Sequence, residues 1–246
     1  MARSLSKWTK YKLLARSKKI RKALPKTLPF GESAFRFMLD RCGSVYVKPV
    51  RGSGGAGVVK VTSGKDGRFV VHHGAKKMPA SGAAEAYAIV RRKTGHRSCL
   101  VQQTVKLLTV GGRPFDVRVM VQRTGRSHWT ATAKLAKIAG PGHIITNVAR
   151  SGGRVASVKT ALRRSGFGER AGSISRRLDR IALAAVRRLH KFYPWINTVG
   201  MDLGVDRRGK VWIIEANFKP AKSLFRRLKD KSAYHRIMRY YSRRGK

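Results

Sequence analysis

The sequence predicts an α+β fold, in which helices pack on sheets built mainly from antiparallel hairpins. Three observations predict it. Residues 201–205 and 211–217 are apolar runs that flank an Asp-Arg-Arg-Gly stretch, a pattern typical of a β-hairpin. Residues 45–48 and 58–62 form a second such pair around a glycine-rich loop. Residues 174–192 carry apolar side chains at helical spacing, which indicates an amphipathic helix that lies across a sheet.

The charge of the chain is extreme. Its 246 residues include 56 Lys and Arg but only 11 Asp and Glu, a net charge of +45. The hydrophobic content of 42% indicates a folded core and excludes a disordered basic tail. The charge indicates either a polyanionic partner or a general bias toward basic residues, and the even spread of Lys and Arg favours the bias. Weak, salt-sensitive binding to polyanions is expected in both cases.

Signals for membranes, export and structural metal are missing from the sequence. No apolar run approaches the ~18 residues of a membrane span, and residues 1–19 lack the apolar core of a secretory signal. Cys42 and Cys99 have no metal-ligand spacing. We therefore expect a cytoplasmic protein with reduced thiols.

The other elements follow from local patterns along the chain. A basic amphipathic helix is expected at 3–23, where Pro25 and Pro29 then stop it. It packs on the main body or, alternatively, lies on a membrane surface or an RNA. The remaining predictions are helices at 33–41, 83–93 and 223–242, and strands at 68–72, 99–105, 113–123 and 129–140.

The hairpin at 201–217 carries three candidate metal ligands. Pairing its strands brings Asp202 close to Glu215 and Asn217, and period-two alternation places Glu215 and Asn217 on one face. Two carboxylates and an amide oxygen suit a hard cation such as Mg²⁺, which usually shares its ligands with substrate phosphates. A salt-bridged hairpin in a basic protein is the alternative.

The glycine-rich loop is a candidate phosphate site. Glycines let backbone N–H groups approach phosphate oxygens, and basic residues at and before the loop add charge. The loop satisfies G-x-G-x-x-G, but a strand follows it where a dinucleotide-binding fold would place a helix. An ordinary glycine-rich turn is the alternative. The candidate residues are Lys48, Arg51, Gly52, Ser53, Gly54, Gly55 and Gly57.

The strand expected at 113–123 alternates cleanly between its two faces. Asp116 and Arg118 fall on the polar face, where they form either a cross-strand ion pair or a site for a phosphate or carboxylate. The next strand carries Lys134 and Lys137. The opposite face of the first strand belongs to the core and carries Phe115, Val117, Val119 and Val121.

The chain resembles the ATP-grasp superfamily, and within it the YheC/YheD-type proteins associated with endospores of Bacillus-like bacteria. Five segments carry the resemblance in the expected order: KWTKYKLL, GSVYVKPVRGSGGAGV, PFDVRVMVQR, AKIAGPGHIITNVARSGG and GMDLGVDRRGKVWIIEANFKP. Together they cover nearly the whole chain. The resemblance implies two α+β lobes that hold ATP between mainly antiparallel sheets. The implied domains are an N-terminal helical segment at 1–44, a small lobe at 45–105 and a large lobe with the metal site at 106–246.

The resemblance also implies roles for single residues. Lys48 and residues 51–57 match the phosphate-binding lysine and the loop that covers the phosphates. Gln103, Thr104 and Val105 fall where the adenine-contacting linker lies. Arg118 matches an arginine that faces phosphate or substrate, and Lys137 would help to balance the remaining charge. The magnesium ligands, for two ions, would be Asp202, Glu215 and Asn217.

The activity implied by the resemblance is that of an ATP- and magnesium-dependent ligase. Such an enzyme converts a carboxylate to an acylphosphate, which an amine or a similar nucleophile then attacks. The basic composition suits an acidic acceptor. Two alternatives are a scaffold of the same fold that binds a polyanion or a spore surface without turnover, and a kinase-like enzyme that releases a stable phosphorylated product.

Overall fold

The computed structural model describes residues 4–52, 54–64, 66–95 and 97–242. The chain divides into two compact units. The larger consists of Met1–Leu24, Lys106–Ile138 and Arg154–Lys246, and the smaller of Pro25–Val105 and Ala139–Gly153. Residues 25–44 and 139–153 thus group with the smaller unit. The lobe boundaries at 44 and 105 stay a prediction.

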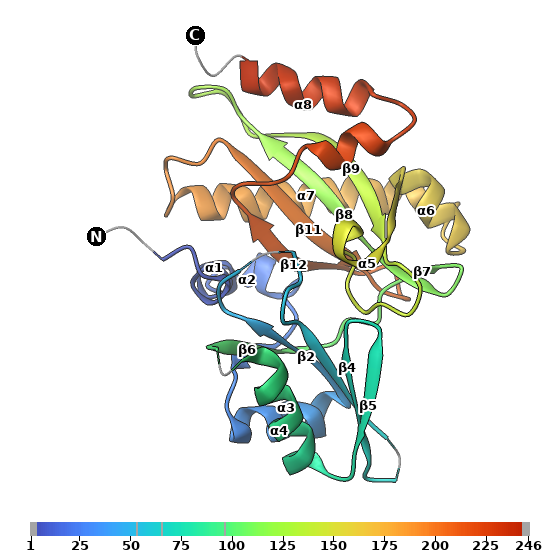
Figure 1. The fold of residues 1–246 in the computed structure, drawn as a ribbon. Helices are drawn as coiled ribbons and strands as arrows, with labels where there is room; N and C mark the ends of the chain where they lie inside the picture. Colours follow the sequence, from blue (N-terminus) through green and yellow to red (C-terminus); the bar gives the residue numbers. More distant parts are fainter. Residues whose placement is uncertain (1–3, 53, 65, 96, 243–246) are drawn as a thin grey trace. The chain divides into compact units, whose positions relative to one another are not determined.

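The smaller unit is built on an antiparallel sheet with the strand order β1-β6-β2-β3-β4-β5. Two helices, α3 (Glu32–Cys42) and α4 (Ala83–Thr94), cover one face (Figure 1). The strands are β1 (Thr27–Pro29), β2 (Ser44–Pro49), β3 (Val59–Ser63), β4 (Phe69–His73), β5 (Lys76–Ala80) and β6 (Cys99–Gln103).

Alternation along β2 separates the core of the smaller unit from its polar face. Val45 and Val47 are fully buried against Phe35 and Met38 of α3. Tyr46 points to the other face, which residues 139–153 partly cover. The Tyr46 hydroxyl donates to the Ile144 carbonyl at 3.1 Å, and burial raises its pKa to about 12.

The larger unit contains a second antiparallel sheet with the order β10-β9-β8-β11-β12, and β7 pairs with β8 outside this path. The predicted strands at 113–123, 129–140, 201–205 and 211–217 are all present. The strand bounds are β7 (Thr109–Val110), β8 (Arg113–Gln122), β9 (Thr130–Ile138), β10 (Arg154–Ala156), β11 (Thr198–Val205) and β12 (Val211–Asn217).

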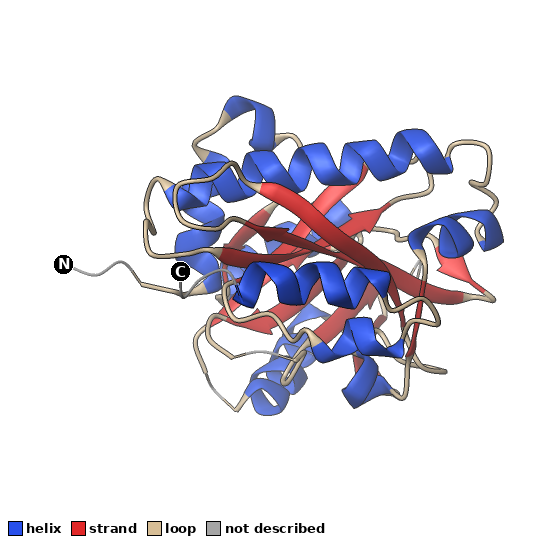
Figure 2. Cartoon of the chain, turned by 90° about the horizontal axis from the view of Figure 1, so that it is seen from above, coloured by secondary structure: helices blue, strands red, loops and turns tan. Residues whose placement is uncertain are grey.

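Helices lie on opposite sides of this sheet (Figure 2). The long helix α7 (Ala171–His190) and α6 (Val158–Arg164) cover the face that carries the predicted core residues of β8, all of which are fully buried. The 3₁₀-helix η1 (Ser223–Arg227) and α8 (Ser232–Ser242) cover part of the other face around Met120. Among the described residues, no helix is long and apolar enough to cross a membrane.

The N-terminal segment covers the free edge of β12. Its helices are α1 (Lys7–Ala15) and α2 (Lys18–Arg21). The Ile213 N–H donates to the Ala23 carbonyl at 2.7 Å, and the Lys10 ammonium donates to the Ala216 carbonyl. These bonds satisfy backbone groups that an edge strand would otherwise expose, so the segment closes one side of the sheet.

Two predicted helices are each broken in two. The helix expected at 3–23 is split at Ser17, which takes an extended conformation between α1 and α2. The helix expected at 223–242 is interrupted by extended Leu228, and Asp230 then accepts a hydrogen bond from the Ser232 N–H at 2.8 Å. The helical spacing of apolar residues continues across both breaks, so the sequence pattern did not predict either break. The α+β class itself is confirmed.

Candidate functional site

The predicted hairpin at residues 201–217 is present and well defined. Asp202 stands directly opposite Glu215, Gly200 stands opposite Asn217, and the register shifts after Asp202. Asp206 fixes the turn, because its carboxylate accepts from the N–H groups of Arg208 and Lys210, both at 2.9 Å, and from the Trp212 indole. Antiparallel pairing therefore places the two carboxylates and the amide on one face.

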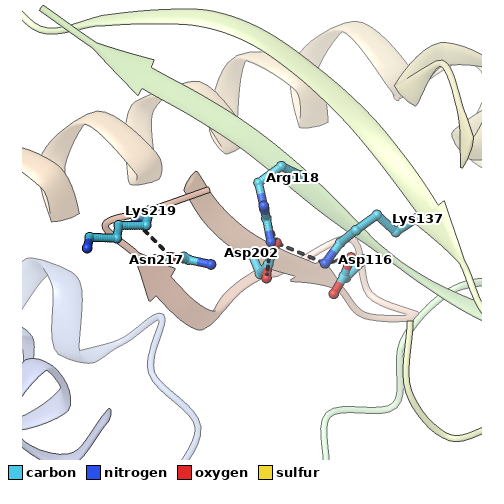
Figure 3. A network of polar contacts seen from close by, with 6 residues as sticks. All are labelled: Asp116, Arg118, Lys137, Asp202, Asn217 and Lys219. Atoms are coloured by element: carbon cyan, nitrogen blue, oxygen red, sulfur yellow. Dashed lines mark hydrogen bonds and ion pairs between the residues drawn. The ribbon is translucent and has the colours of Figure 1, made fainter. Parts of the chain in front are cut away.

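Asp202 belongs to a buried network of four charged side chains (Figure 3). Arg118 Nε and Nη2 donate to the two carboxylate oxygens of Asp202 at 2.6 and 2.9 Å. Lys137 Nζ lies 3.0 Å from Asp202 Oδ1 and 3.1 Å from Asp116 Oδ1. Each of the four residues is at most 7% exposed. The cross-strand ion pair considered for Arg118 is therefore present, with Asp202 as its partner.

The electrostatics of the network favour the charged states of Asp202, Lys137 and Arg118. Burial by itself would raise the pKa of Asp202, but Arg118 and then Lys137 outweigh it and hold that pKa well below its usual value. Burial would lower the pKa of Lys137, yet Asp116 and Asp202 raise it. Arg118 behaves similarly, because Asp202 outweighs desolvation. Two cations thus balance two buried carboxylates.

Gly200 makes room for this arrangement. A Cβ atom at this position would meet Pro220 Cβ at 2.6 Å and Arg118 Cδ at 3.0 Å. The absence of a side chain allows Arg118 to lie across β11 and reach Asp202.

Glu215 and Asn217 are more accessible than Asp202. The Glu215 side chain is 31% exposed, and Lys7 Nζ of α1 lies 3.6 Å from its Oε1 atom. The Asn217 side-chain oxygen accepts from the Lys219 N–H at 2.9 Å (Figure 3). The sequence pattern did not predict Lys7 here, because more than 200 residues separate it from Glu215.

The donor set fits a magnesium ion that shares its ligands with phosphate. Within the described part of the chain, no three His, Cys, Asp or Glu side chains gather to hold a metal on their own. Asp202, Glu215 and Asn217 offer two carboxylates and one amide, and Mg²⁺ is usually bound by one or two carboxylates together with substrate phosphates. Asp202 accepts three bonds from Arg118 and Lys137, so it keeps about one of its four lone-pair positions.

In the smaller unit, Lys48 lies on the polar face of β2. Its ammonium donates to the side-chain oxygen of Gln102 at 2.8 Å, and the Gln102 amide donates to Thr27 Oγ1 at 2.7 Å. A chain of neutral groups therefore orients the lysine just before the glycine-rich loop. Gln102 lies one residue before the three linker residues that the resemblance implies. Period-two spacing places it on the same face of β6 as Leu100, which pairs with Lys48, and this is the signal that could have identified it.

The glycine-rich loop has the conformation that its composition predicts. Gly52, Gly54, Gly55 and Gly57 all have positive φ, between 69° and 101°, which other residues rarely adopt. Residues 139–153 hold the loop: Arg150 Nε donates to the Gly54 carbonyl at 3.0 Å, and a Cβ at Gly55 would lie 2.8 Å from Ile145 Cδ1. Arg51 is exposed, and Ser53 lies outside the described residues.

The predicted adenine linker continues from β6. The Gln103 N–H donates to the Lys26 carbonyl at 2.8 Å, and the Thr104 N–H donates to the Ser44 carbonyl at 3.1 Å. Val105 is half-buried. These bonds tie the linker to the smaller unit, and its contact with adenine stays a prediction.

The predicted residues therefore form two groups on different units. Arg118, Lys137 and Asp202 are in direct contact, with Glu215 and Asn217 beside them on the hairpin. Lys48, the loop and residues 103–105 belong to the smaller unit. Sequence reasoning missed Lys7 and Arg150, and it missed Gln102 as the partner of Lys48 and Asp116 as the partner of Lys137.

Comparison with known proteins identifies the family. A family model described as YheC/D-like ATP-grasp matches residues 2–243. The endospore coat-associated protein YheD of Bacillus subtilis (strain 168) is 30% identical over 233 residues, which cover 89% of this chain and 49% of that protein. The chain thus spans about half the length of this curated relative.

Solved structures agree on the fold. D-cycloserine synthetase DcsG aligns with a TM-score of 0.56 and 13% identity, over 97% of this chain and 70% of that one. The ATP-grasp ligase PsnB, in complex with a minimal precursor, aligns with a TM-score of 0.53 and 15% identity, over 96% and 60%. The D-alanine-D-alanine ligase of Coxiella burnetii aligns with a TM-score of 0.51 and 13% identity, over 97% and 58%. The chain has the ATP-grasp fold and belongs to the YheC/D-like ATP-grasp family.

Proposed function

We propose that this chain is an ATP- and magnesium-dependent ligase that activates a carboxylate as an acylphosphate. The proposal is supported by membership of the ATP-grasp family together with two groups of residues that suit opposite charges. One group offers oxygen ligands to a cation, and the other offers an ammonium and a glycine-rich backbone to an anion.

The smaller unit supplies the nucleotide-binding residues. Lys48, oriented by Gln102, neutralises phosphate charge. The left-handed glycines let backbone N–H groups approach the phosphate oxygens, with Arg51 adding charge. Gln103, Thr104 and Val105 contact the adenine through the linker.

The larger unit supplies the metal ligands and the charge balance. Glu215, Asp202 and Asn217 would hold magnesium, which when bound neutralises the phosphates; the resemblance extends this to two ions. Arg118 and Lys137 fix the orientation of Asp202 and keep it ionised. Both cations also balance phosphate charge that gathers beside Asp202 in the reaction.

The reaction class follows from this charge arrangement. A carboxylate oxygen attacks the γ-phosphorus of ATP and ADP leaves, which gives an acylphosphate. A nucleophile such as an amine then attacks the acyl carbon and phosphate leaves. The residues described hold and neutralise the anionic groups, and no protein nucleophile is required. The net charge of +45 suits an acidic acceptor, and the name of the B. subtilis relative supports an association with the spore.

The test is a thermal-shift titration with ATP, with and without magnesium, followed by measurement of ADP release with pools of carboxylates and amines. A ligand present at 100 times its Kd stabilises the native state by about 2.7 kcal/mol. We expect magnesium-dependent stabilisation that is reduced in Glu215→Gln and Lys48→Met. The matched controls are Glu169→Gln and Lys76→Met, which remove exposed charges. Equal shifts in all four variants would refute the site.

The alternative is an ATP-grasp scaffold that binds a polyanion or spore surface without turnover, and the charge favours it. Nucleotide-induced stabilisation without ADP release under any acceptor pool would support this alternative. ADP release with a stable phosphorylated product, and no requirement for an amine, would instead indicate the kinase-like reaction.

A further inference from the structure

Helix α7 gathers basic residues into one straight stripe. Arg176, Arg180 and Arg187 of α7 and its C-cap residue Lys191 are all exposed, while the opposite side of the helix is buried in the core of the larger unit. At 100° and 1.5 Å per residue, the four side chains fall within about 60° of arc and span about 22 Å. The even spread of charge along the sequence therefore conceals a local concentration in the fold. We call these four residues the α7 stripe.

Acidic residues do not offset this charge. Asp179 is the single acidic residue between positions 171 and 201. Its carboxylate forms an ion pair with Lys134 of β9, so its charge is already balanced on the side of the helix that faces the sheet. The α7 stripe thus presents positive charge along its whole length.

The neighbouring elements extend the basic surface. Leu13 and Ile20 of α1 and α2 share the core with α7, and Arg188 Nε of α7 donates to the Leu13 carbonyl at 3.2 Å. The first 31 residues contain no Asp or Glu. Exposed basic residues on this segment are Lys12, Arg16, Lys18, Lys19, Arg21 and Lys22.

We propose that the α7 stripe binds the phosphate backbone of double-stranded nucleic acid. Three of its four residues are arginines, whose planar guanidinium groups bind phosphate oxygens through paired hydrogen bonds. Arg176 and Arg180 are about 6 Å apart along the helix, as are Arg187 and Lys191, and about 10 Å separates Arg180 from Arg187. A duplex carries a phosphate about every 3.4 Å of axis on each strand, so a rigid stripe can contact several phosphates at once.

Lipid is the competing partner, and the stripe itself does not fit it well. Membrane-surface helices expose apolar side chains to the bilayer. Between the stripe residues lie the half-buried Leu183, which packs on the core, and the small Ala184. Elsewhere in the larger unit, Leu5 and Trp195 are 53% and 56% exposed, and a lipid surface would use those two residues.

The stripe is separate from the proposed ligase site. It lies on the helix that covers the face of Phe115 and Val117, whereas Asp202 and Arg118 lie on the opposite face of that sheet. Binding of nucleic acid can therefore be measured independently of ATP.

The experiment measures duplex DNA binding by fluorescence anisotropy across a salt series. The stripe variant replaces Arg176, Arg180, Arg187 and Lys191 by Gln. The matched control replaces four exposed basic residues of the smaller unit, Lys76, Lys77, Arg92 and Lys93, by Gln. Both variants lose four positive charges. Each lost phosphate contact reduces the magnitude of the slope of log K against log salt by about 0.9. We therefore expect a reduction of about 3.6 in the stripe variant, which loses four contacts, and of less than about 1 in the control.

Three outcomes would overturn the proposal. Equal losses in both variants would show that binding follows total charge. Unchanged DNA binding by the stripe variant would show that the stripe does not bind DNA. If phosphatidylglycerol vesicle binding were also lost in Leu5→Ser/Trp195→Ala, the larger unit would be assigned a lipid surface around those two residues. Equal loss of poly-L-glutamate and DNA binding would show that phosphate is not recognised.

The control for folding is the melting temperature of the stripe variant and its increase on addition of ATP, both of which should be unchanged. If the stripe variant does not fold, the double variant Arg180→Gln/Arg187→Gln replaces it.

Discussion

The polar faces of the two sheets differ in how they hold charged side chains. In the larger unit, two carboxylates are buried with two cations, so oxygen ligands are kept ionised beside Glu215. In the smaller unit, Lys48 is oriented by a neutral amide, and the four acidic residues, Glu32, Asp40, Asp66 and Glu85, are all exposed. The difference is that one polar face buries paired charges, whereas the other holds a lysine that is oriented by a neutral amide.

The largest expected effect comes from breaking the buried network. Asp202→Ala leaves Arg118 and Lys137 in a buried site without this carboxylate, and we expect a loss of about 3–5 kcal/mol in the free energy of unfolding. Urea denaturation measures it. Glu32→Ala, which removes an exposed i,i+4 pair with Arg36, should cost at most about 0.5 kcal/mol. Similar losses in the free energy of unfolding for the two variants would mean that the buried Asp202 pair is no more stabilising than the exposed Glu32–Arg36 pair.

The smaller unit should instead be sensitive to its backbone. Gly55→Ala adds a Cβ close to Ile145 at a φ of +76°, so we expect a loss of about 1–2 kcal/mol. Gly172→Ala, within α7 and without a close contact, should stabilise by about 0.5–1 kcal/mol. Chemical denaturation of both variants provides the comparison, and a neutral Gly55→Ala would mean that the loop tolerates other conformations.

Acid should weaken the larger unit through Asp202. Because its pKa is lower in the folded than in the unfolded state, its stabilisation is complete above the usual value of 3.8 and is lost as pH falls toward the folded value. Asp202→Asn lacks this titration, so its free energy of unfolding should fall less between pH 5 and pH 2. The raised pKa of Lys137 acts in the opposite direction, because its stabilisation is lost as pH rises above 10.5. Parallel acid profiles for the two proteins would contradict the assignment.

The smallest expected effect concerns Lys7. Its ammonium balances Glu215 at 3.6 Å and repels a dication at the same carboxylate. Lys7→Gln should therefore raise the affinity for Mg²⁺ in the presence of ATP by up to about fivefold, the equivalent of about 1 kcal/mol. Thermal shift at increasing magnesium measures this, with Lys12→Gln on the exposed side of α1 as the control. A weaker affinity would indicate that Lys7 positions Glu215 instead.

Local patterns predicted most of the strands and the candidate metal residues, because alternation and turn chemistry act over a few residues. The strands β1, β5, β7 and β10 were not predicted. The β11–β12 hairpin and the buried face of β8 followed directly from such patterns. Contacts between distant segments could not be predicted in this way. Examples are Lys7 beside Glu215 and Arg150 on the glycine-rich loop. The break at Ser17 was hidden because apolar positions continued across it.

The tie between the N-terminal segment and β12 has a consequence for synthesis on the ribosome. Lys10 and Ala216 are 206 positions apart, so the bond between α1 and β12 can form only after β12 has been synthesised. The smaller unit needs only residues 25–105 and 139–153, and it can form while the larger unit is still being translated. The basic N-terminal segment, which holds no Asp or Glu, therefore cannot complete its contacts with β12 until that strand emerges.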